Sequence, residues 1–421
     1  MVQHILDTLV SVGVNKTNLV YGHGAEQLKS TLGNNDLNWS LQAEQLGTGH
    51  AVMQAVPNIN DDENVLILVG DAPLIKAQTL QNLITTKNDS DLVLLTVVVE
   101  DPTGMGRIVR DGEQVKAIVE HKDATEAQRE INEINTGIMI MGGADLKRWL
   151  GNLNSDNAQQ EYYLTDVIEM AANEGKVIKA VQATSETEVE GINNRVQLAK
   201  IECAYQHEMA ENLMLNGVSL ADPYRIDVRG ELITGQDVNI DVNVVFEGKV
   251  TIGNDVRIGA NCILKDCEVA DGATIEPFSM LEQAKVGENC SVGPYARLRP
   301  GSVMKAQSRV GNFVEMKKTE LGEGSKANHL TYLGDTTVGS GVNIGAGTIT
   351  CNYDGVNKSK TLIGDGAFIG SNSALVAPIS IGNQATVGAG SVVNKNVEDQ
   401  QLAVCRAKQR NIDGWSRPVK K

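Results

Sequence analysis

Aromatic residues are scarce in this chain, at 4 % of 421 residues. No apolar run approaches the roughly 20 residues of a membrane span, and the first residues lack the basic and apolar regions of a signal peptide. The chain has 37 basic residues (Lys and Arg) and 53 acidic residues (Asp and Glu), which leaves a net charge of −16. An acidic protein is a poor general surface for nucleic acid or anionic lipid. We therefore expect small-molecule ligands, no nucleic acid and no membrane.

Cysteine is also sparse, and its spacing contains no metal-like pairs. The six residues are Cys203, Cys262, Cys267, Cys290, Cys351 and Cys405. Scattered thiols are typical of reduced proteins, so we expect a cytoplasmic location. Cys262 and Cys290 occupy a position that small residues otherwise take in the repeat described next, where a thiol acts as a small apolar filler.

A repeat of six residues dominates the chain from residue 240 to residue 393. An aliphatic residue recurs every sixth position, and Gly follows it in most repeats. The clearest series is Ile363, Ile369, Leu375, Ile381, Val387 and Val393, with an earlier one at Ile240, Phe246, Ile252, Ile258 and Leu264. This period predicts a solenoid of short strands, three to a coil, whose aliphatic side chains fill the axis. A β-sandwich with Gly-rich turns is the alternative, but its variable turns would not hold one period.

The first part of the chain has an α/β pattern. Residues 1–12 predict an amphipathic helix. Val65–Val69 and Leu92–Val99 are continuous apolar runs, which predict strands buried on both faces. Strands alternating with helices predict a parallel sheet with ligands at the strand C-termini. The 421 residues contain neither G-x-G-x-x-G nor a P-loop.

The pattern divides the chain into four parts. Residues 1–193 form the α/β domain, and residues 194–216 have the helical periodicity of one linker helix that ends at Asn216-Gly217. Residues 217–397 form the β-helix, and residues 398–421 form a C-terminal tail.

Motifs in both halves resemble one bacterial family, the bifunctional N-acetylglucosamine-1-phosphate uridylyltransferase / glucosamine-1-phosphate N-acetyltransferase. In the first half these are LQAEQLGTGH from residue 41, GDAPLI from 70, DPTGMGRI from 101, VEHKD from 119, EINTG from 133 and EGINNR from 190. In the second half they are YARLRPG from 295, GNFVEMKK from 311, NHLTYLGD from 328 and NIGAGTITCNYDGVNK from 343. The resemblance covers essentially the whole chain. It implies a Rossmann-like nucleotidyltransferase domain and a left-handed β-helix that forms a homotrimer.

The resemblance implies an acetyltransferase site on the β-helix, with acetyl-CoA as donor and His329 as general base. The imidazole pKa suits that role near neutral pH, although a loop histidine with a structural hydrogen bond is the alternative. Glu315 would orient His329, or else be a solvated carboxylate. The residues that would bind glucosamine-1-phosphate are Arg299, Lys317, Tyr332, Asn343 and Lys358. The residues that would contact acetyl-CoA are Ala346, Asn352, Tyr353, Ser371, Ala389 and Arg406.

Residue types and spacing qualify these assignments. Arg297 and Arg299 alternate on a strand, so both should point outward while Leu298 fills the core. The alternative is an ordinary solvated face. The segment Asn352-Tyr353-Asp-Gly interrupts the repeat. It is interpreted either as a loop that reaches a neighbouring subunit or as a simple turn. Transfer is expected to be direct, with no acyl-cysteine at Cys351.

The resemblance also implies uridylyl transfer from UTP with Mg²⁺ in the first half. Asp71 and Asn193 would hold the metal, since Mg²⁺ uses few carboxylates plus waters and phosphates. A turn after a strand is the alternative for Asp71. The residues that would bind UDP-N-acetylglucosamine are Gln42, Gly47, Thr48, Gly70, Asp71, Gly106, Glu120, Asn135 and Asn193.

The family begins with a strand and a G-x-G-T-R-M loop that these 421 residues do not contain. We expect a truncated chain, or one whose start was assigned at an internal Met, with impaired uridylyl transfer and a looser first domain. Two other functions stay open: a different hexapeptide sugar transferase with a regulatory nucleotidyltransferase-like domain, and an inactive scaffolding trimer.

Overall fold

The fold is a computed structural model that describes residues 1–22, 24–32 and 37–420. Contact clustering divides it into two compact units, Met1–Ala204 and Tyr205–Lys421. A single helix, α9 (Arg195–Leu215), occupies the position where the sequence predicts a linker helix. Among the described residues, no helix has both the length and the apolar character that spanning a bilayer requires. The four-part functional division of the chain stays a prediction.

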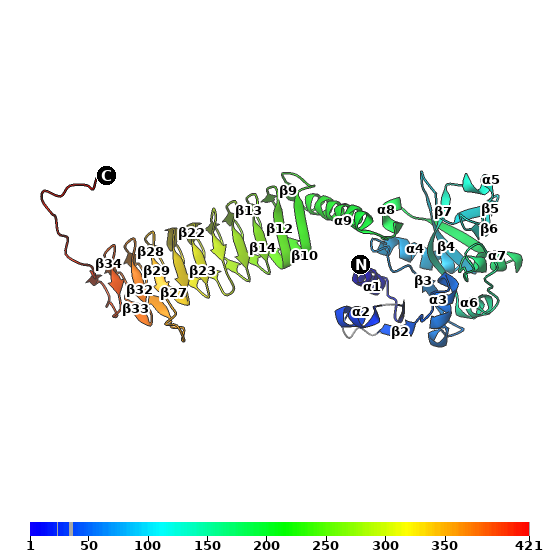
Figure 1. The fold of residues 1–421 in the computed structure, drawn as a ribbon, viewed down its shortest axis with the longest axis horizontal. Helices are drawn as coiled ribbons and strands as arrows, with labels where there is room; N and C mark the ends of the chain where they lie inside the picture. Colours follow the sequence, from blue (N-terminus) through cyan, green and yellow to red (C-terminus); the bar gives the residue numbers. More distant parts are fainter. Residues whose placement is uncertain (23, 33–36, 421) are drawn as a thin grey trace. The chain divides into compact units, whose positions relative to one another are not determined.

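The first unit begins with the amphipathic helix predicted at the start of the chain, α1 (Val2–Ser11), which buries Ile5, Leu6 and Leu9. Its other helices follow in order along the chain (Figure 1). They are α2 (Ala25–Leu32), α3 (Thr48–Ala55), η1 (Val56–Asn58), α4 (Ala77–Lys87), α5 (Glu126–Arg129), α6 (Gly143–Leu150), α7 (Asp166–Asn173) and α8 (Glu186–Val189). Apolar side chains on α4, α6 and α7 pack against the strands.

Two sheets hold the strands of this unit. β1 (Thr17–Tyr21) pairs only with β2 (Leu37–Leu41) among the described strands. The larger sheet has the order β6-β5-β7-β4-β8, and β3 also pairs with β7. These strands are β3 (Asn64–Ile67), β4 (Leu92–Val98), β5 (Arg107–Asp111), β6 (Gln114–Val119), β7 (Glu133–Gly142) and β8 (Ile178–Gln182).

The larger sheet corrects two expectations. It is mixed rather than parallel, because β7 runs antiparallel to β3, β4 and β5, and only β4 and β8 are parallel neighbours. β4 is buried as predicted, but Val65–Val69 is only half-buried. In the described part of the chain β7 is the one partner of β3, so this apolar strand has an open edge.

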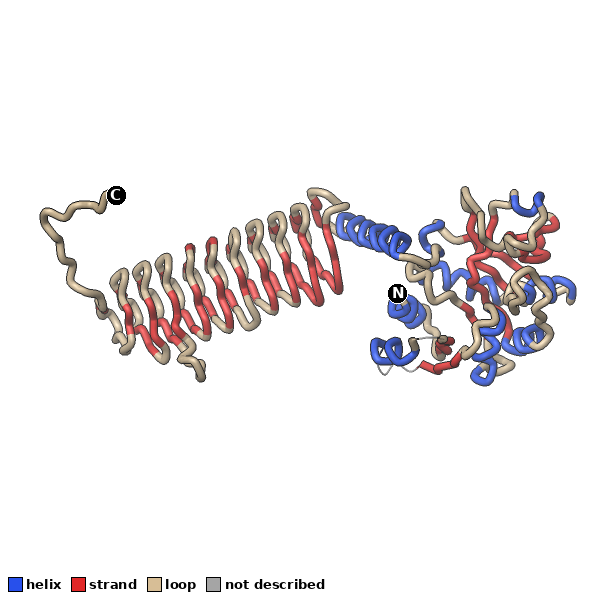
Figure 2. The backbone as a smooth tube through the Cα atoms, in the orientation of Figure 1, coloured by secondary structure: helices blue, strands red, loops and turns tan. Residues whose placement is uncertain are grey.

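The second unit is the predicted parallel β-helix, whose strands form three faces, and Figure 2 shows its stacked coils. On the first face lie β9 (Val218–Leu220), β11 (Val238–Ile240), β13 (Arg257–Ile258), β16 (Thr274–Ile275), β19 (Ser291–Val292), β22 (Arg309–Asn312), β25 (Lys326–His329), β28 (Asn343–Ile344), β31 (Phe368–Ile369), β34 (Thr386–Val387) and β36 (Leu402–Ala403). Two longer strands, β10 (Ile226–Thr234) and β12 (Val244–Ile252), begin the other two faces.

The second face continues with β14 (Ile263–Lys265), β17 (Met280–Glu282), β20 (Arg297–Leu298), β23 (Glu315–Lys317), β26 (Tyr332–Gly334), β29 (Ile349–Cys351), β32 (Ala374–Val376) and β35 (Val392–Val393). The third face continues with β15 (Glu268–Val269), β18 (Lys285–Val286), β21 (Val303–Met304), β24 (Glu320–Leu321), β27 (Thr336–Val338), β30 (Thr361–Ile363) and β33 (Ile379–Ile381). Each strand pairs in parallel with its equivalent in the next coil, as in a left-handed β-helix.

The six-residue repeat is confirmed by burial. Every aliphatic residue of the two series lies in one continuous core along the axis. Glycine follows these residues because neighbouring coils approach closely. A Cβ at Gly345 would lie 2.5 Å from the Ser371 amide nitrogen. Cys262 and Cys290 are buried fillers, as expected, at 0 % and 1 % exposure.

Candidate active sites

His329 ends β25 and is exposed at the corner between the first and second faces. The β22–β25 register places Asn312 beside it, and the His329 Nδ1 to Asn312 Oδ1 distance is 3.0 Å. An amide oxygen only accepts, so Nδ1 carries the proton and Nε2 is left as the basic nitrogen. The ring that carries this nitrogen is exposed.

The resemblance assigns the orienting role to Glu315, and that assignment stays a prediction; in this structure Glu315 pairs with Arg299. The Glu315 Oε1 lies 2.7 Å from Nη1 of Arg299 in an ion pair one coil apart. The orienting hydrogen bond that the structure shows for His329 is therefore the one with Asn312. Asn312 was not among the predicted site residues, although it lies in the motif GNFVEMKK.

Three cations converge on the second face and its loop. The charge of Lys358, followed by that of Arg299, lowers the pKa of Lys317 below its usual value. Leu298 is fully buried while Arg297 is exposed and Arg299 half-buried, so the predicted alternation is confirmed. Such a cluster suits a phosphate dianion, because its charges are fixed and close.

Tyr332 and Asn352 meet beside these cations. A Cβ at Gly334 would collide with the Tyr332 hydroxyl and lie 2.8 Å from Asn352 Nδ2. Asn352 is buried and donates from Nδ2 to Asp335 Oδ2 at 2.5 Å. Gly334 and Asp335 were also not among the predicted site residues. Gly334 provides the space in which the two side chains meet.

Asn343 lies elsewhere, on β28 of the first face. Its neighbour Ile344 fills the core at 3 % exposure, so Asn343 points outward from a different side of the coil than Arg299 and Lys317. One chain therefore does not bring together all five residues expected to bind the sugar phosphate.

The loop between β29 and β30 is a turn that leaves the coils. Tyr353 and Lys358 form an antiparallel bridge, and Asp354 Oδ1 accepts hydrogen bonds from the backbone of Val356 and Asn357. Tyr353 is 60 % exposed. The loop places Lys358 near Lys317 and leaves Tyr353 in the open.

The residues expected to contact acetyl-CoA follow His329 along the same corner. Ala346, Ser371 and Ala389 each precede the corner residue of a successive coil. Backbone hydrogen bonds join the row, from Asn372 N to Ala346 O at 2.7 Å and from Gly390 N to Ser371 O at 2.8 Å. Arg406 donates to the Ala389 carbonyl at 2.8 Å. The row is open and lined by small residues.

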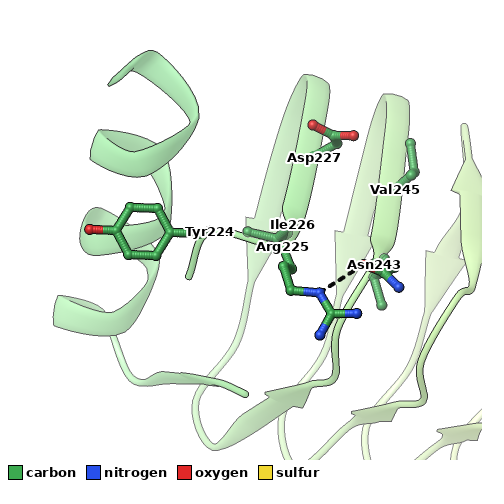
Figure 3. Close-up of a pocket in the computed structure, with 7 residues that line it drawn as sticks. Tyr224, Arg225, Ile226, Asp227, Asn243 and Val245 are labelled. Carbon is green, nitrogen blue, oxygen red and sulfur yellow. Dashed lines mark hydrogen bonds between the residues drawn. The ribbon is translucent and has the colours of Figure 1, made fainter. Parts of the chain in front are cut away.

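Cavities of the second unit lie away from these residues. One of about 260 Å³ is lined by Tyr224, Arg225, Ile226, Asp227, Asn243, Val244 and Val245. Figure 3 shows Arg225 donating to Asn243 there, at 3.1 Å. Another of about 420 Å³ lies between Thr251 and Met304. Neither cavity includes a residue expected to act in acetyl transfer. Those residues lie on an open surface of the single chain.

The first unit brings together Gln42, Gly47 and Thr48 at the start of α3. Gln42 Nε2 donates to the Gly47 carbonyl at 3.1 Å. Gly47 has a φ of 109° and packs so closely on Tyr162 that a side chain would clash. The Thr48 hydroxyl accepts from the Leu164 amide at 3.1 Å. The three residues therefore form one rigid polar turn.

Gly106, Glu120 and Asn135 also meet. The Gly106 carbonyl accepts from the Asn135 amide at 2.9 Å, and a Cβ at Gly106 would lie 3.3 Å from Glu120 Oε1. Burial, followed by the charge of Asp123, raises the pKa of Glu120, which accepts a hydrogen bond from Thr165. This carboxyl group is suited to accept from a sugar hydroxyl.

Asp71 follows β3 and meets the segment that carries Asn193. Its carbonyl accepts from Ile192 N at 3.0 Å, and its Oδ2 would lie 3.1 Å from a Cβ at Gly191. No cluster of three or more His, Cys, Asp or Glu that could hold a metal occurs in the described ranges. One carboxylate and one amide oxygen fit Mg²⁺, which takes its remaining ligands from water and phosphate.

Family comparisons agree with both units. A nucleotidyl transferase model matches residues 1–187, a GMPPB C-terminal domain model matches residues 228–321, and a model of the hexapeptide repeat of succinyl-transferase matches residues 360–395. The solved structure of a putative glucose-1-phosphate thymidylyltransferase from Bacillus anthracis in complex with a sucrose matches with 15 % identity and a TM-score of 0.40. It covers 48 % of this chain and 80 % of that chain.

A relative covers the whole chain. The bifunctional protein GlmU of Pseudoalteromonas atlantica is 74 % identical over 420 residues, which are 100 % of this chain and 93 % of the relative. This coverage does not confirm the expected truncation, which stays a prediction. With this identity over its full length, the chain belongs to the family of the bifunctional protein GlmU.

Proposed function

We propose that this protein transfers acetyl from acetyl-CoA to the amine of glucosamine-1-phosphate, giving N-acetylglucosamine-1-phosphate and CoA. The observation that carries the proposal is the corner of the β-helix. His329 lies where the first face turns into the second, the second face carries Arg299 and Lys317 with Lys358 near Lys317, and the open row of small residues continues along the corner of His329. The cations suit a phosphate, and the row suits a long thin acyl donor.

The reaction follows from this arrangement. The cations bind the phosphate and hold the sugar. His329 Nε2 takes a proton from the amine as the nitrogen attacks the thioester carbonyl, so a C–N bond forms and the C–S bond breaks. The imidazolium then returns its proton to the departing thiolate. Holding both substrates beside the base supplies much of the rate, since it replaces a bimolecular encounter by a positioned one.

Cys351 has no part in this proposal. Direct attack needs no acyl-enzyme, and the thiol would need an activating base of its own. The Cys351→Ala variant should therefore keep its acetyl-transfer rate within about twofold, allowing for the small packing change that any core-proximal substitution brings. A burst of CoA release that only Cys351 supports would contradict direct transfer.

We also propose uridylyl transfer from UTP to N-acetylglucosamine-1-phosphate in the first unit, giving UDP-N-acetylglucosamine and pyrophosphate. Asp71 and Asn193 would hold Mg²⁺, which supplies charge neutralisation on the phosphates when bound. Gln42, Gly47 and Thr48 would contact the uracil, while Gly106, Glu120 and Asn135 would contact the sugar. The name of the bifunctional relative supports two activities on one chain.

The proposal includes a cytoplasmic homotrimer. All six cysteines are free in the structure, as a reducing compartment would maintain them. In one chain Asn343 lies on a different face from the other sugar-phosphate residues, so a site between neighbouring copies could gather the full set.

Two assays test the proposed function. Glucosamine-1-phosphate should trigger release of free CoA thiol from acetyl-CoA, and N-acetylglucosamine-1-phosphate should trigger pyrophosphate release from UTP when Mg²⁺ is present. Absence of the first reaction would refute the main proposal. Absence of the second reaction would refute the proposed uridylyl transfer.

A further inference from the structure

Arg107 carries the one buried basic side chain in the described part of the chain, with 1 % exposure at the start of β5. A buried cation is costly unless anions or hydrogen-bond acceptors compensate it. Hydrogen bonds from Thr103, and then the charge of Arg107, lower the pKa of Asp101. In the described ranges, however, no carboxylate forms an ion pair with this guanidinium, and its Nε has no hydrogen-bond partner.

The guanidinium of Arg107 instead contacts three separate segments of the first unit. Its Nη1 donates to the Met105 carbonyl. Its Nη2 lies 3.3 Å from Nδ1 of His121 and 3.5 Å from the Arg129 carbonyl oxygen. A guanidinium only donates, so Nδ1 of His121 is the acceptor. The side chain therefore joins the loop before β5, the loop after β6 and the end of α5.

Two residues expected to meet the sugar are chain neighbours of these contacts. Met105 precedes Gly106, and His121 follows Glu120. A Cβ at Gly106 would lie 3.3 Å from Glu120 Oε1, and the Gly106 carbonyl accepts from the Asn135 amide at 2.9 Å. A guanidinium that fixes both neighbours therefore limits how far Gly106 can move from Glu120.

Arginine suits such a junction because its five N–H groups point in fixed directions within one plane. A lysine ammonium is a single point of charge on a flexible stem. A buried charge adds little stability by itself, and a well-packed apolar residue in the same space is often equally stable. The loops that this guanidinium holds therefore explain its burial better than any stability that it adds.

We propose that Arg107 is a positioning residue for the sugar-phosphate substrate of uridylyl transfer, and that it holds Gly106 and Glu120 at the separation that the sugar needs. Its own side chain is buried and does not touch the substrate. The expected uracil contacts lie in another turn, at the start of α3. Loss of the guanidinium should therefore weaken recognition of the sugar phosphate and spare that of UTP. The inference rests on the proposed uridylyl transfer.

Three variants of the full chain test this role. Arg107→Met removes the charge and the N–H groups but keeps an unbranched side chain, and Arg107→Lys keeps the charge alone. Arg110→Met is the matched control, because Arg110 lies on the same strand and pairs with Glu133 at 2.6 Å outside this network. Pyrophosphate release from UTP with Mg²⁺ is measured with each substrate varied in turn. Circular dichroism and amide hydrogen exchange are measured on the same samples.

We expect Arg107→Met to raise KM for N-acetylglucosamine-1-phosphate at least tenfold and to leave KM for UTP within twofold. Arg107→Lys should raise the same KM less, because its ammonium replaces part of the contacts. The amides of Met105 and Asp123 donate to the carbonyls of Pro102 and Glu120, and they should exchange at least tenfold faster in Arg107→Met. The control should match the native protein in each measurement.

A folded Arg107→Met variant with the native KM for the sugar phosphate would overturn the proposal, and so would an equal rise in both KM values. If that variant fails to fold, an unchanged KM and unchanged exchange in Arg107→Lys overturn it. A native protein that releases no pyrophosphate refutes the proposed uridylyl transfer instead. The exchange rates then still decide whether Arg107 holds the two loops.

Discussion

The hydrogen bond between Asn312 and His329 decides which ring nitrogen can act as the base. Because the Asn312 oxygen accepts from Nδ1, Nε2 is left as the nitrogen with a free lone pair. The sequence indicates the histidine through its motif, but it does not indicate the amide. An Asn in a turn has no signature that separates an orienting role from a purely local one.

Substitutions of His329 and of Asn312 should lower kcat to different extents. His329→Gln removes the base and should lower kcat for acetyl transfer by about 10²–10⁴-fold. Asn312→Ala removes one orienting hydrogen bond and should lower kcat about tenfold, with KM nearly unchanged. Steady-state kinetics across pH check this, because Asn312→Ala should also shift the acidic limb of the profile, where the base becomes protonated. An unchanged profile would contradict the orienting role.

Asp166 gives a pH-dependent stability to the first unit. Burial, followed by the charges of Glu169, Glu120 and Asp123, raises the pKa of Asp166 to about 6. The pKa of Asp166 is thus higher in the folded protein than in the unfolded chain. The contribution of Asp166 to stability is therefore fully present below about pH 4 and is lost as pH rises through about 6.

Asp166→Asn should therefore stabilise the protein at about pH 8, by roughly 1 kcal/mol once solvent screening of this half-exposed group is allowed for. The gain should shrink toward zero below about pH 4, because the native side chain is then protonated. Urea unfolding at several pH values measures this effect, and Asp62→Asn, at an exposed position of the same unit, is the control. A pH-independent gain would contradict the argument.

At the scale of elements, the six-residue period predicts the solenoid almost completely, since no other fold holds that period. Ile363, Leu375 and Val387 lie in the axis as predicted. The apolar run at Val65–Val69 predicts a strand but not its direction, and β3 proved antiparallel to β7 and half-buried. Hydrophobicity indicates burial in general, whereas the partner of a strand depends on the whole topology.

Close contact between coils makes certain glycines sensitive. A Cβ at Gly370 would lie 2.7 Å from the Val387 carbonyl and closer still to the Ala389 amide. Gly370→Ala should therefore destabilise the last coils by about 1–3 kcal/mol, as overpacking does. Gly366→Ala is not a clean control because φ is positive there. Gly142→Ala, with nothing near its Cβ, is the better comparison in thermal unfolding.

On the scale of the whole molecule, the candidate sites fall into different compact units. Asp71→Asn should lower uridylyl transfer at least 100-fold and leave acetyl transfer within about twofold, while His329→Gln should do the reverse. Parallel assays of both variants with each substrate pair measure this separation. A variant that loses both activities while remaining folded would show that the sites are coupled.

The thiols of Cys262, Cys267 and Cys290 lie in the axis, at 0, 1 and 1 % exposure, whereas Cys203 and Cys405 are exposed. Burial raises the pKa of Cys262 to about 11, so it is both shielded and protonated. An alkylating reagent should modify the outer pair within minutes and the inner three only when neighbouring turns separate. The labelling rates of the three inner thiols therefore measure how often the β-helix opens locally at each of these positions.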